Sequence, residues 1–207
     1  MGRAGERLSG ALVWTNGPFG VGKTQAASAL HRRLPGSFVC DPEHLGAGLQ
    51  RMTPPELRGD SQDLPLWRRG VLATLDATMT RFPGVLIVPM TLVNPVYFGE
   101  IIGELRQRGH TVHHVTLLAS PRTLRRRLRS RTESSRRWGA AQIQRCLDGL
   151  ARLDPADALQ TDGLTHAAVV EAIARHATLT LTPDRSGPRR RTLRRTLRRL
   201  AIRFRER

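Results

Sequence analysis

The chain has 207 residues, of which 39% are hydrophobic and 4% aromatic, so it is long enough for one domain with an aliphatic core. No apolar run approaches the length of a membrane-spanning helix and the first residues carry no apolar signal region, so we expect a cytoplasmic protein. The formal net charge of +17 needs an explanation, and the arginines that cause it gather in two clusters.

A phosphate-binding loop is the first feature with a chemical role. The pattern G-x-x-x-x-G-K-[ST] is matched by Gly17, Pro18, Phe19, Gly20, Val21, Gly22, Lys23 and Thr24. Glycines allow positive φ, so the backbone N–H groups can point at phosphate oxygens. Lys23 is expected at the outer phosphates of ATP, and Thr24 is expected to offer its hydroxyl to Mg²⁺. A strand predicted within residues 8–15 and a helix predicted over 24–33 supply the context that the motif needs.

The next predicted strand, Ser37–Cys40, ends at a candidate catalytic residue, Asp41. A carboxylate at this edge of the acceptor pocket can accept a hydrogen bond from an acceptor hydroxyl, so Asp41 is the candidate base. The alternative is that Asp41-Pro42-Glu43 only begins the helix expected around residues 44–51. Cys40 and Cys146 lack metal-ligand spacing and are interpreted as buried thiols.

The central part of the chain predicts a loop over 59–65, a helix over 66–81 and a buried strand over Val85–Val88. No acidic residue stands at the end of this strand, where a Walker-B carboxylate is expected. Mg²⁺ would then be held mainly by Thr24, nucleotide oxygens and water. Thr91 is read either as lining the acceptor pocket or as an ordinary hydroxyl at a strand end.

Aromatic side chains near these elements have two interpretations. Trp67 lies on the predicted acceptor-side helix, and Tyr97-Phe98 follows the central strand. They either form an apolar acceptor pocket or pack in the core.

The remaining elements alternate between helices and strands. They are expected as a helix over 95–108, a strand over 111–118, a helix from Ser120-Pro121, a helix over 138–150, a strand over 158–161 and a helix over 165–177. This alternation predicts an α/β fold with a mostly parallel sheet of about five strands, and ligands bind such sheets at the carboxyl ends of the strands.

The first arginine cluster is interpreted as a lid over about residues 122–138. Arg127 and Arg131 are four residues apart and share a helical face, so closure would bring guanidinium groups to the β- and γ-phosphates. The alternative is a solvated basic helix. The cluster comprises Arg122, Arg125, Arg126, Arg127, Arg129, Arg131, Arg136 and Arg137.

Several motifs in order resemble one known family, the tunicamycin-resistance ATP-binding proteins. They are Trp14 to Gln25, Asp41-Pro42-Glu43, Pro65 to Arg68, Ile87 to Thr91, Val112-His113-His114 and Gln160-Thr161-Asp162. The resemblance covers about residues 11–185. It implies a P-loop NTPase fold, a nucleoside- or shikimate-kinase-like three-layer sandwich, and ATP-dependent resistance to tunicamycin, a nucleoside antibiotic with a fatty acyl chain. The domain is placed at 11–182, behind a flexible extension at 1–10.

Three functions are compared. The first is a kinase that phosphorylates a hydroxyl of tunicamycin with ATP and Mg²⁺, with Lys23, Asp41, Arg127 and Arg131 as its catalytic residues. The second is ATP-dependent sequestration of the drug at the membrane without modification. The third, a nucleic-acid-dependent NTPase, is disfavoured because the chain has no recognition motif and few aromatic residues for base stacking.

The second arginine cluster forms a basic tail, residues 183–207, with eleven arginines and two acidic residues. If the tail is helical, one face is apolar and the opposite face consists almost entirely of arginine. This pattern is typical of a helix that lies on an anionic membrane surface, and it predicts membrane contact through residues 189–205. The alternatives are a helix packed on its own domain and a disordered tail. The apolar face comprises Leu193, Leu197, Leu200, Ala201 and Phe204.

Overall fold

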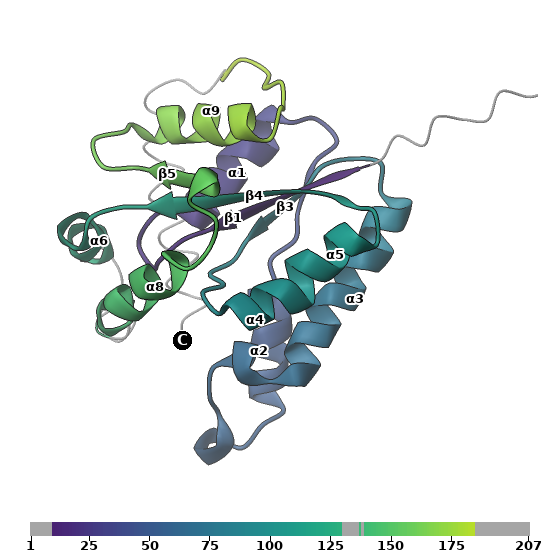
Figure 1. The fold of residues 1–207 in the computed structure, drawn as a ribbon, viewed down its shortest axis with the longest axis vertical. Coiled ribbons are helices and arrows are strands. Elements are labelled where there is room, and N and C mark those ends of the chain that lie inside the picture. The colour runs from purple at the N-terminus through teal and green to yellow at the C-terminus, as the bar shows by residue number, and fades with distance from the viewer. Residues whose placement is uncertain (1–9, 130–136, 138, 185–207) are drawn as a thin grey trace, which may run out of the picture.

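Five parallel strands form the centre of the fold, in the order β2-β3-β1-β4-β5 (Figure 1). The computed structural model describes residues 10–129, 137 and 139–184. The strands are β1 (Ala11–Asn16), β2 (Phe38–Val39), β3 (Leu86–Pro89), β4 (Thr111–Leu118) and β5 (Ala158–Gln160). The α/β class, the parallel sheet and the strand number are confirmed.

Helices cover both faces of the sheet, which gives three layers (Figure 1). Helices α1 (Lys23–Arg33) and α9 (His166–His176) pack on one face, and α3 (Pro65–Arg81) and α5 (Glu104–Gln107) pack on the other. The side chains of β1 alternate accordingly: Val13 belongs to the core under α1, whereas Leu12 and Trp14 belong to the core under α3. A parallel sheet buried on both faces explains the continuous apolar runs of the sequence.

The remaining helices lie around the sheet edges. They are α2 (Glu43–Arg51), α4 (Pro95–Phe98), α6 (Pro121–Leu128) and α8 (Ile143–Leu150), with short 3-10 turns η1 (Pro55–Leu57), η2 (Ser61–Asp63) and η4 (Pro155–Asp157). Helix α6 begins as the sequence predicts, because the Ser120 hydroxyl accepts a hydrogen bond from the Thr123 N–H and a proline follows at the first helical position.

The helix predicted over 95–108 is not a regular α-helix. It comprises α4, a π-helical stretch η3 (Gly99–Gly103) and α5. The wider π turn accommodates one extra residue, and the consecutive side chains Ile101 and Ile102 are both fully buried. An apolar pattern with a 3.6-residue period does not signal this insertion.

The two cysteines differ in burial. Cys146 is buried as predicted, but Cys40 is only partly buried at the end of β2. Within the described part of the chain, no helix combines the length and apolar character needed to cross a membrane.

Candidate active site

The loop between β1 and α1 adopts backbone conformations that glycine favours. Gly17, Gly20 and Gly22 have φ angles of 140°, 86° and 110°. A Cβ on Gly17 would lie 2.4 Å from the Leu117 carbonyl oxygen of β4, so the loop start is pressed against the sheet. Gly22 is the N-cap of α1, and a Cβ added to it would meet nothing within 4 Å. The open side of the loop thus lies at the positive end of α1, which suits an anion.

Lys23 lies against this loop. Its Nζ donates hydrogen bonds to the carbonyl oxygens of Gly17 (2.8 Å) and Pro18 (3.2 Å), and it is the only lysine among the 34 basic residues of the chain. Phosphate oxygens are stronger acceptors than carbonyls, so a bound triphosphate would draw the ammonium group off them. Thr24 occupies the first turn of α1, directly after Lys23 and the N-cap Gly22. These residues fit the phosphates of a nucleotide.

Thr91 anchors the loop. Its hydroxyl donates to the Gly17 carbonyl oxygen at 2.9 Å, and the residue is buried. This contact identifies Thr91 as a support of the phosphate loop, a role that neither sequence interpretation included. No carboxylate follows Pro89 at the end of β3, where Met90 and Thr91 stand.

Sequence reasoning gave no role to the polar residues buried beneath the loop. Asn16 ends β1, and His114 and Thr116 lie beside it on β4, in register with Trp14 and Asn16. Their side chains are hydrogen-bonded to one another and to Asp157. A polar residue within an apolar strand was the available signal, because buried polar groups need partners.

Asp41 lies two residues after the end of β2, beyond Cys40, at the carboxyl edge of the sheet. Its Oδ1 accepts a hydrogen bond from the Glu43 N–H at 3.1 Å, and its carbonyl accepts from the His44 N–H. Asp41 therefore shapes the start of α2, as one interpretation expected.

The aromatic residues Trp67, Tyr97 and Phe98 all contact the core under α3. Trp67 is fully buried in the core and its Nε1 donates to the Pro42 carbonyl at 3.3 Å, so it fixes α2 against α3. Tyr97 is half-buried, donates its hydroxyl to Asp63 and stacks under the Arg68 guanidinium, 4.1 Å from the ring centroid. Phe98 packs edge-on against His114. Core packing describes Trp67 and Phe98.

Arg127 contacts the phosphate loop from α6. Its guanidinium donates to the carbonyl oxygens of Val21 and Thr161 and to the Thr161 hydroxyl, each at 3.1 Å. Burial lowers the pKa of Arg127, and the nearby Asp162 carboxylate opposes that effect. Arg127 thus ties the loop to the end of β5. Arg131 and Arg136 lie outside the described residues, as do all of 130–136 and 138 of the lid expected over 122–138.

Asp162 joins α6 to the same edge. Its carboxylate accepts hydrogen bonds from the Ser120 N–H (2.7 Å) and the Ser120 hydroxyl (3.0 Å). Hydrogen bonds from Thr123 and Ser120 hold the pKa of Asp162 below its ordinary value. The carboxylate is exposed and remains ionised at neutral pH, so it fixes the start of the arginine-bearing helix.

Helix α8 lies close to the phosphate loop. The pKa of the Cys146 thiol is raised by burial, and the charge of Lys23 partly counteracts this. From the same helix, Arg145 reaches Asp60 beside η2, with 3.6 Å between the charged atoms. Helices α6 and α8 both lie at the carboxyl ends of the strands (Figure 1). The loop is thus bordered by elements distant in sequence.

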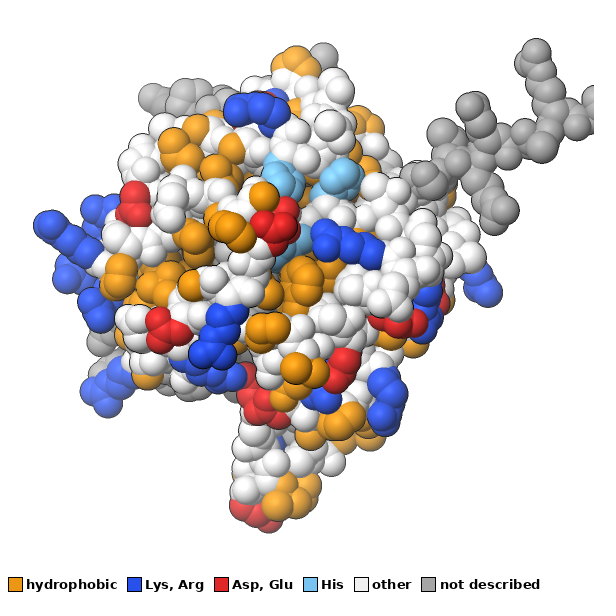
Figure 2. All heavy atoms as spheres, viewed as in Figure 1, with side chains coloured by type: hydrophobic (Ala, Val, Ile, Leu, Met, Phe, Trp, Pro, Cys, Tyr) orange, Lys and Arg blue, Asp and Glu red, His pale blue; other side chains and the backbone are white. Residues whose placement is uncertain are grey.

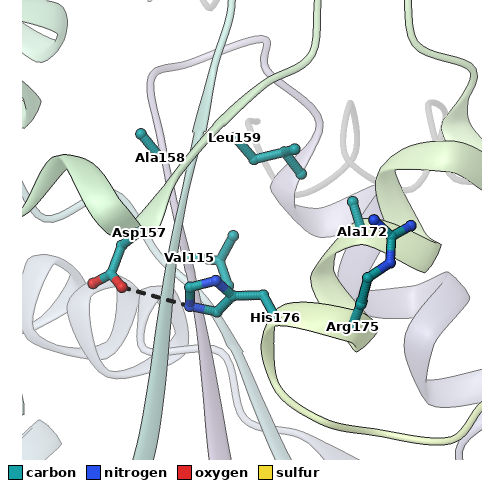
Figure 3. A pocket seen from close by; sticks show the side chains of 7 residues that line it. All are labelled: Val115, Asp157, Ala158, Leu159, Ala172, Arg175 and His176. Atoms are coloured by element: carbon teal, nitrogen blue, oxygen red, sulfur yellow. Dashed lines mark ion pairs between the residues drawn. The ribbon is translucent and has the colours of Figure 1, made fainter.

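A separate cavity of about 260 Å³ lies between β5 and α9 (Figure 3). It is lined by Val115, Asp157, Ala158, Leu159, Ala172, Arg175 and His176, and contains no residue of the phosphate loop. On this face, histidine side chains gather beside a carboxylate (Figure 2). The cavity is therefore not the phosphate site, although Asp157 belongs both to its wall and to the network beneath the loop.

Comparisons with known proteins agree with this geometry. The AAA domain family model matches residues 12–154. The tunicamycin resistance protein of Deinococcus radiodurans is 36% identical, with a TM-score of 0.70 over 84% of this chain and 99% of that one. No curated protein matches.

Two kinases of known structure share the fold at lower identity. An unliganded sugar kinase from Janibacter sp. HTCC2649 is 16% identical, with a TM-score of 0.60 over 83% of this chain and 96% of that one. The shikimate kinase of Bacteroides thetaiotaomicron is 18% identical, with a TM-score of 0.55 over 82% of this chain and 99% of that one. At these identities the likeness shows the fold alone, and that fold is the α/β P-loop kinase fold.

Proposed function

The chain belongs to the AAA domain family and, within it, to the family of the tunicamycin resistance protein, and from that premise we propose that it transfers the γ-phosphoryl group of ATP to a hydroxyl of tunicamycin or a related nucleoside. The observation that carries the proposal is the phosphate loop, whose three glycines have positive φ and whose lysine lies against it. Phosphoryl transfer depends mainly on positioning and on stabilisation of charge, and such a loop supplies both for the donor.

The donor half uses the loop and the start of α1. The loop Gly17 to Thr24 would hold the phosphates through backbone N–H groups that follow Pro18, and Lys23 would move from the Gly17 and Pro18 carbonyls to the outer phosphates. Mg²⁺ bound with ATP would neutralise charge on the β- and γ-oxygens. The Thr24 hydroxyl would be its protein ligand, because β3 ends without a carboxylate.

The acceptor half uses Asp41. Its carboxylate would accept the proton of the acceptor hydroxyl while the acceptor oxygen bonds to the γ-phosphorus and the bond from that phosphorus to the bridging oxygen breaks. ADP leaves with the electron pair of that bond. Arg127, which already bonds the Val21 carbonyl, would stabilise transferred charge together with Arg131.

Mass spectrometry of tunicamycin after incubation with ATP, Mg²⁺ and the protein tests this proposal. We expect a mass gain of one phosphoryl group, lost in the Lys23→Met variant. The proposal would be overturned if folded protein that binds ATP left the drug unmodified.

A second candidate, ATP-dependent binding of the drug without modification, is favoured by the lack of a carboxylate after Pro89. It predicts tight ATP-dependent retention of intact tunicamycin. The same assay separates the candidates, because only phosphoryl transfer consumes one ATP for each modified drug molecule.

The basic tail, residues 183–207, lies outside the described residues except for 183 and 184. We propose that residues 189–205 bind an anionic membrane surface, since apolar and arginine faces alternate there at helical spacing. Co-sedimentation with vesicles containing phosphatidylserine should be lost when the chain is cut before Pro183. Equal sedimentation of both forms would contradict membrane contact by the tail.

A further inference from the structure

Three polar side chains are buried in the middle of the sheet, directly under the phosphate loop. Asn16 is 0% exposed, His114 1% and Thr116 2%. Burying such groups is costly unless each polar atom has a partner. The hydrogen bonds of Asn16 and His114 therefore fix their orientation and the position of the proton on the imidazole.

Asn16 joins the first loop residue to the segment after β3. Its Oδ1 accepts hydrogen bonds from the N–H groups of Gly17 (2.8 Å) and Leu92 (2.9 Å). Its Nδ2 donates to the Leu92 carbonyl (2.8 Å) and lies 3.2 Å from His114 Nε2. Since Oδ1 must accept and Nδ2 must donate, His114 Nε2 has to be the acceptor of the fourth bond.

Asp157 determines the rest of the imidazole. The His114 Nδ1 lies 2.8 Å from Asp157 Oδ2, so Nδ1–H donates to the carboxylate while Nε2 keeps its lone pair for Asn16. The Thr116 hydroxyl lies 3.3 Å from the same Nε2, and Phe98 packs edge-on against the ring, with 4.8 Å between centroids. His114 is thus held neutral in one tautomer and cannot turn.

We propose that His114 is a positioning residue of the phosphate loop: its neutral imidazole, held by Asp157, keeps Asn16 oriented so that Gly17 presents the loop correctly to ATP. The proposal rests on nucleotide binding at that loop. A proton on Nε2 would place a donor against the Nδ2 donor of Asn16 at 3.2 Å. The amide would have to turn, and it would lose its bonds from the Gly17 and Leu92 N–H groups.

The surroundings of His114 favour the neutral form. Burial lowers its pKa below 6.5, the Asp157 carboxylate of η4 opposes this, and Arg106 of α5 and His176 of α9 add to the lowering. His176 also lies 3.5 Å from the other Asp157 oxygen, at the wall of the cavity (Figure 3). The unfolded chain takes up this proton at higher pH than the folded protein does. Stability linked to His114 is therefore present above pH 6.5 and declines as the pH falls toward the lowered folded value.

Binding of MgATP between pH 8 and pH 5 by the full chain tests the proposal. Titration of the nucleotide is common to all variants, so the comparison is between wild type, His114→Gln and the matched control His113→Gln. His113 is the preceding residue of β4, and its pKa is also lowered by burial, but its side chain points to the opposite face of the sheet.

We expect His114→Gln to bind MgATP about 5-fold more weakly than wild type at pH 7.5, because glutamine fills the site without the same geometry. Wild type should lose more affinity than His114→Gln as the pH falls toward the lowered pKa of His114, because the variant lacks the titrating imidazole. His113→Gln should follow wild type. Identical pH profiles of wild type and His114→Gln would overturn the proposal.

Nitrogen NMR of the imidazole groups gives a readout independent of ATP. At pH 7 His114 should be neutral with its proton on Nδ1, and the Gly17 amide signal should shift at the pH where His114 titrates. A charged His114, the Nε2–H tautomer, or a Gly17 signal insensitive to that titration would refute the network. Failure of wild type to bind ATP at any pH would instead refute the proposed function, and the NMR result would still decide the role of His114.

Discussion

The proposed donor and acceptor sides of the candidate site are built differently. Helix α1 buries six of its eleven residues, and the loop before it is held by Asn16, Thr91 and Arg127. On the acceptor side, α2 buries only Gly46, and the turns η1 and η2 bury no residue. Met52 and Leu57 there are 83% and 72% exposed. The phosphate side is preorganised for one ligand group, whereas the acceptor side leaves apolar surface uncovered.

The two sides have different tasks: one binds the phosphates common to all nucleoside triphosphates, and the other binds a particular acceptor. Every nucleoside triphosphate presents the same phosphates, so a rigid loop lowers the cost of ordering it at each turnover. Acceptors differ in shape, and an exposed segment with few buried contacts can adapt to one of them. Changes on the donor side should therefore affect catalysis or folding strongly, and changes on the acceptor side should act on substrate choice.

Replacement of the only lysine should have the largest effect. Lys23→Met removes the mobile charge at the outer phosphates, and we expect phosphoryl transfer to fall about 10³-fold. Initial rates with saturating ATP measure this, and the thermal unfolding midpoint shows whether the fold is kept. Activity within a few-fold of wild type would mean that the loop is not the donor site.

Truncation of one leucine on each side compares the contributions of the two sides to stability. Leu30→Ala on α1 removes a fully buried side chain and should lower the free energy of unfolding by about 2–5 kcal/mol. Leu57→Ala on η1 removes an exposed side chain and should change it by less than about 0.5 kcal/mol. Urea unfolding measures both. Similar losses of unfolding free energy in the two variants would contradict the difference in packing between the two sides.

Asp41→Asn tests the acceptor side directly. The amide oxygen can still accept from the Glu43 N–H, so the start of α2 should be kept, while the base is lost. We expect kcat to fall about 10²-fold with the Kd for ATP unchanged. If kcat is retained, Asp41 serves only the helix start.

The smallest effect concerns the loop anchor. Thr91→Val removes the bond to the Gly17 carbonyl and should weaken ATP binding by about 1 kcal/mol, or about 5-fold. The matched control is Thr78→Val on the exposed face of α3, whose hydroxyl bonds only to the Thr74 carbonyl. Isothermal titration with ATP should leave the control unchanged. Equal weakening in both variants would argue against a specific anchor.

Local pattern was sufficient for much of the fold. Strands over 111–118 and 85–88 and helices over 24–33 and 165–177 were predicted to within about two residues, because apolar periodicity and end signals lie within each segment. It failed at residues 99–103, where the π turn depends on packing of Ile101 and Ile102 against the sheet. It also assigned Thr91 to a pocket or a strand end, since no sequence signal joins it to Gly17.

The amino-acid sequence by itself determined the phosphate loop, because eight consecutive residues carry the whole motif and their geometry is local. Only the tertiary structure decided what holds that loop. Asn16 and His114 are 98 residues apart, and His114 and Asp157 are 43 apart. They meet because β1 pairs with β4 in a particular register, and that register arises from burial on both faces of the sheet rather than from any local pattern.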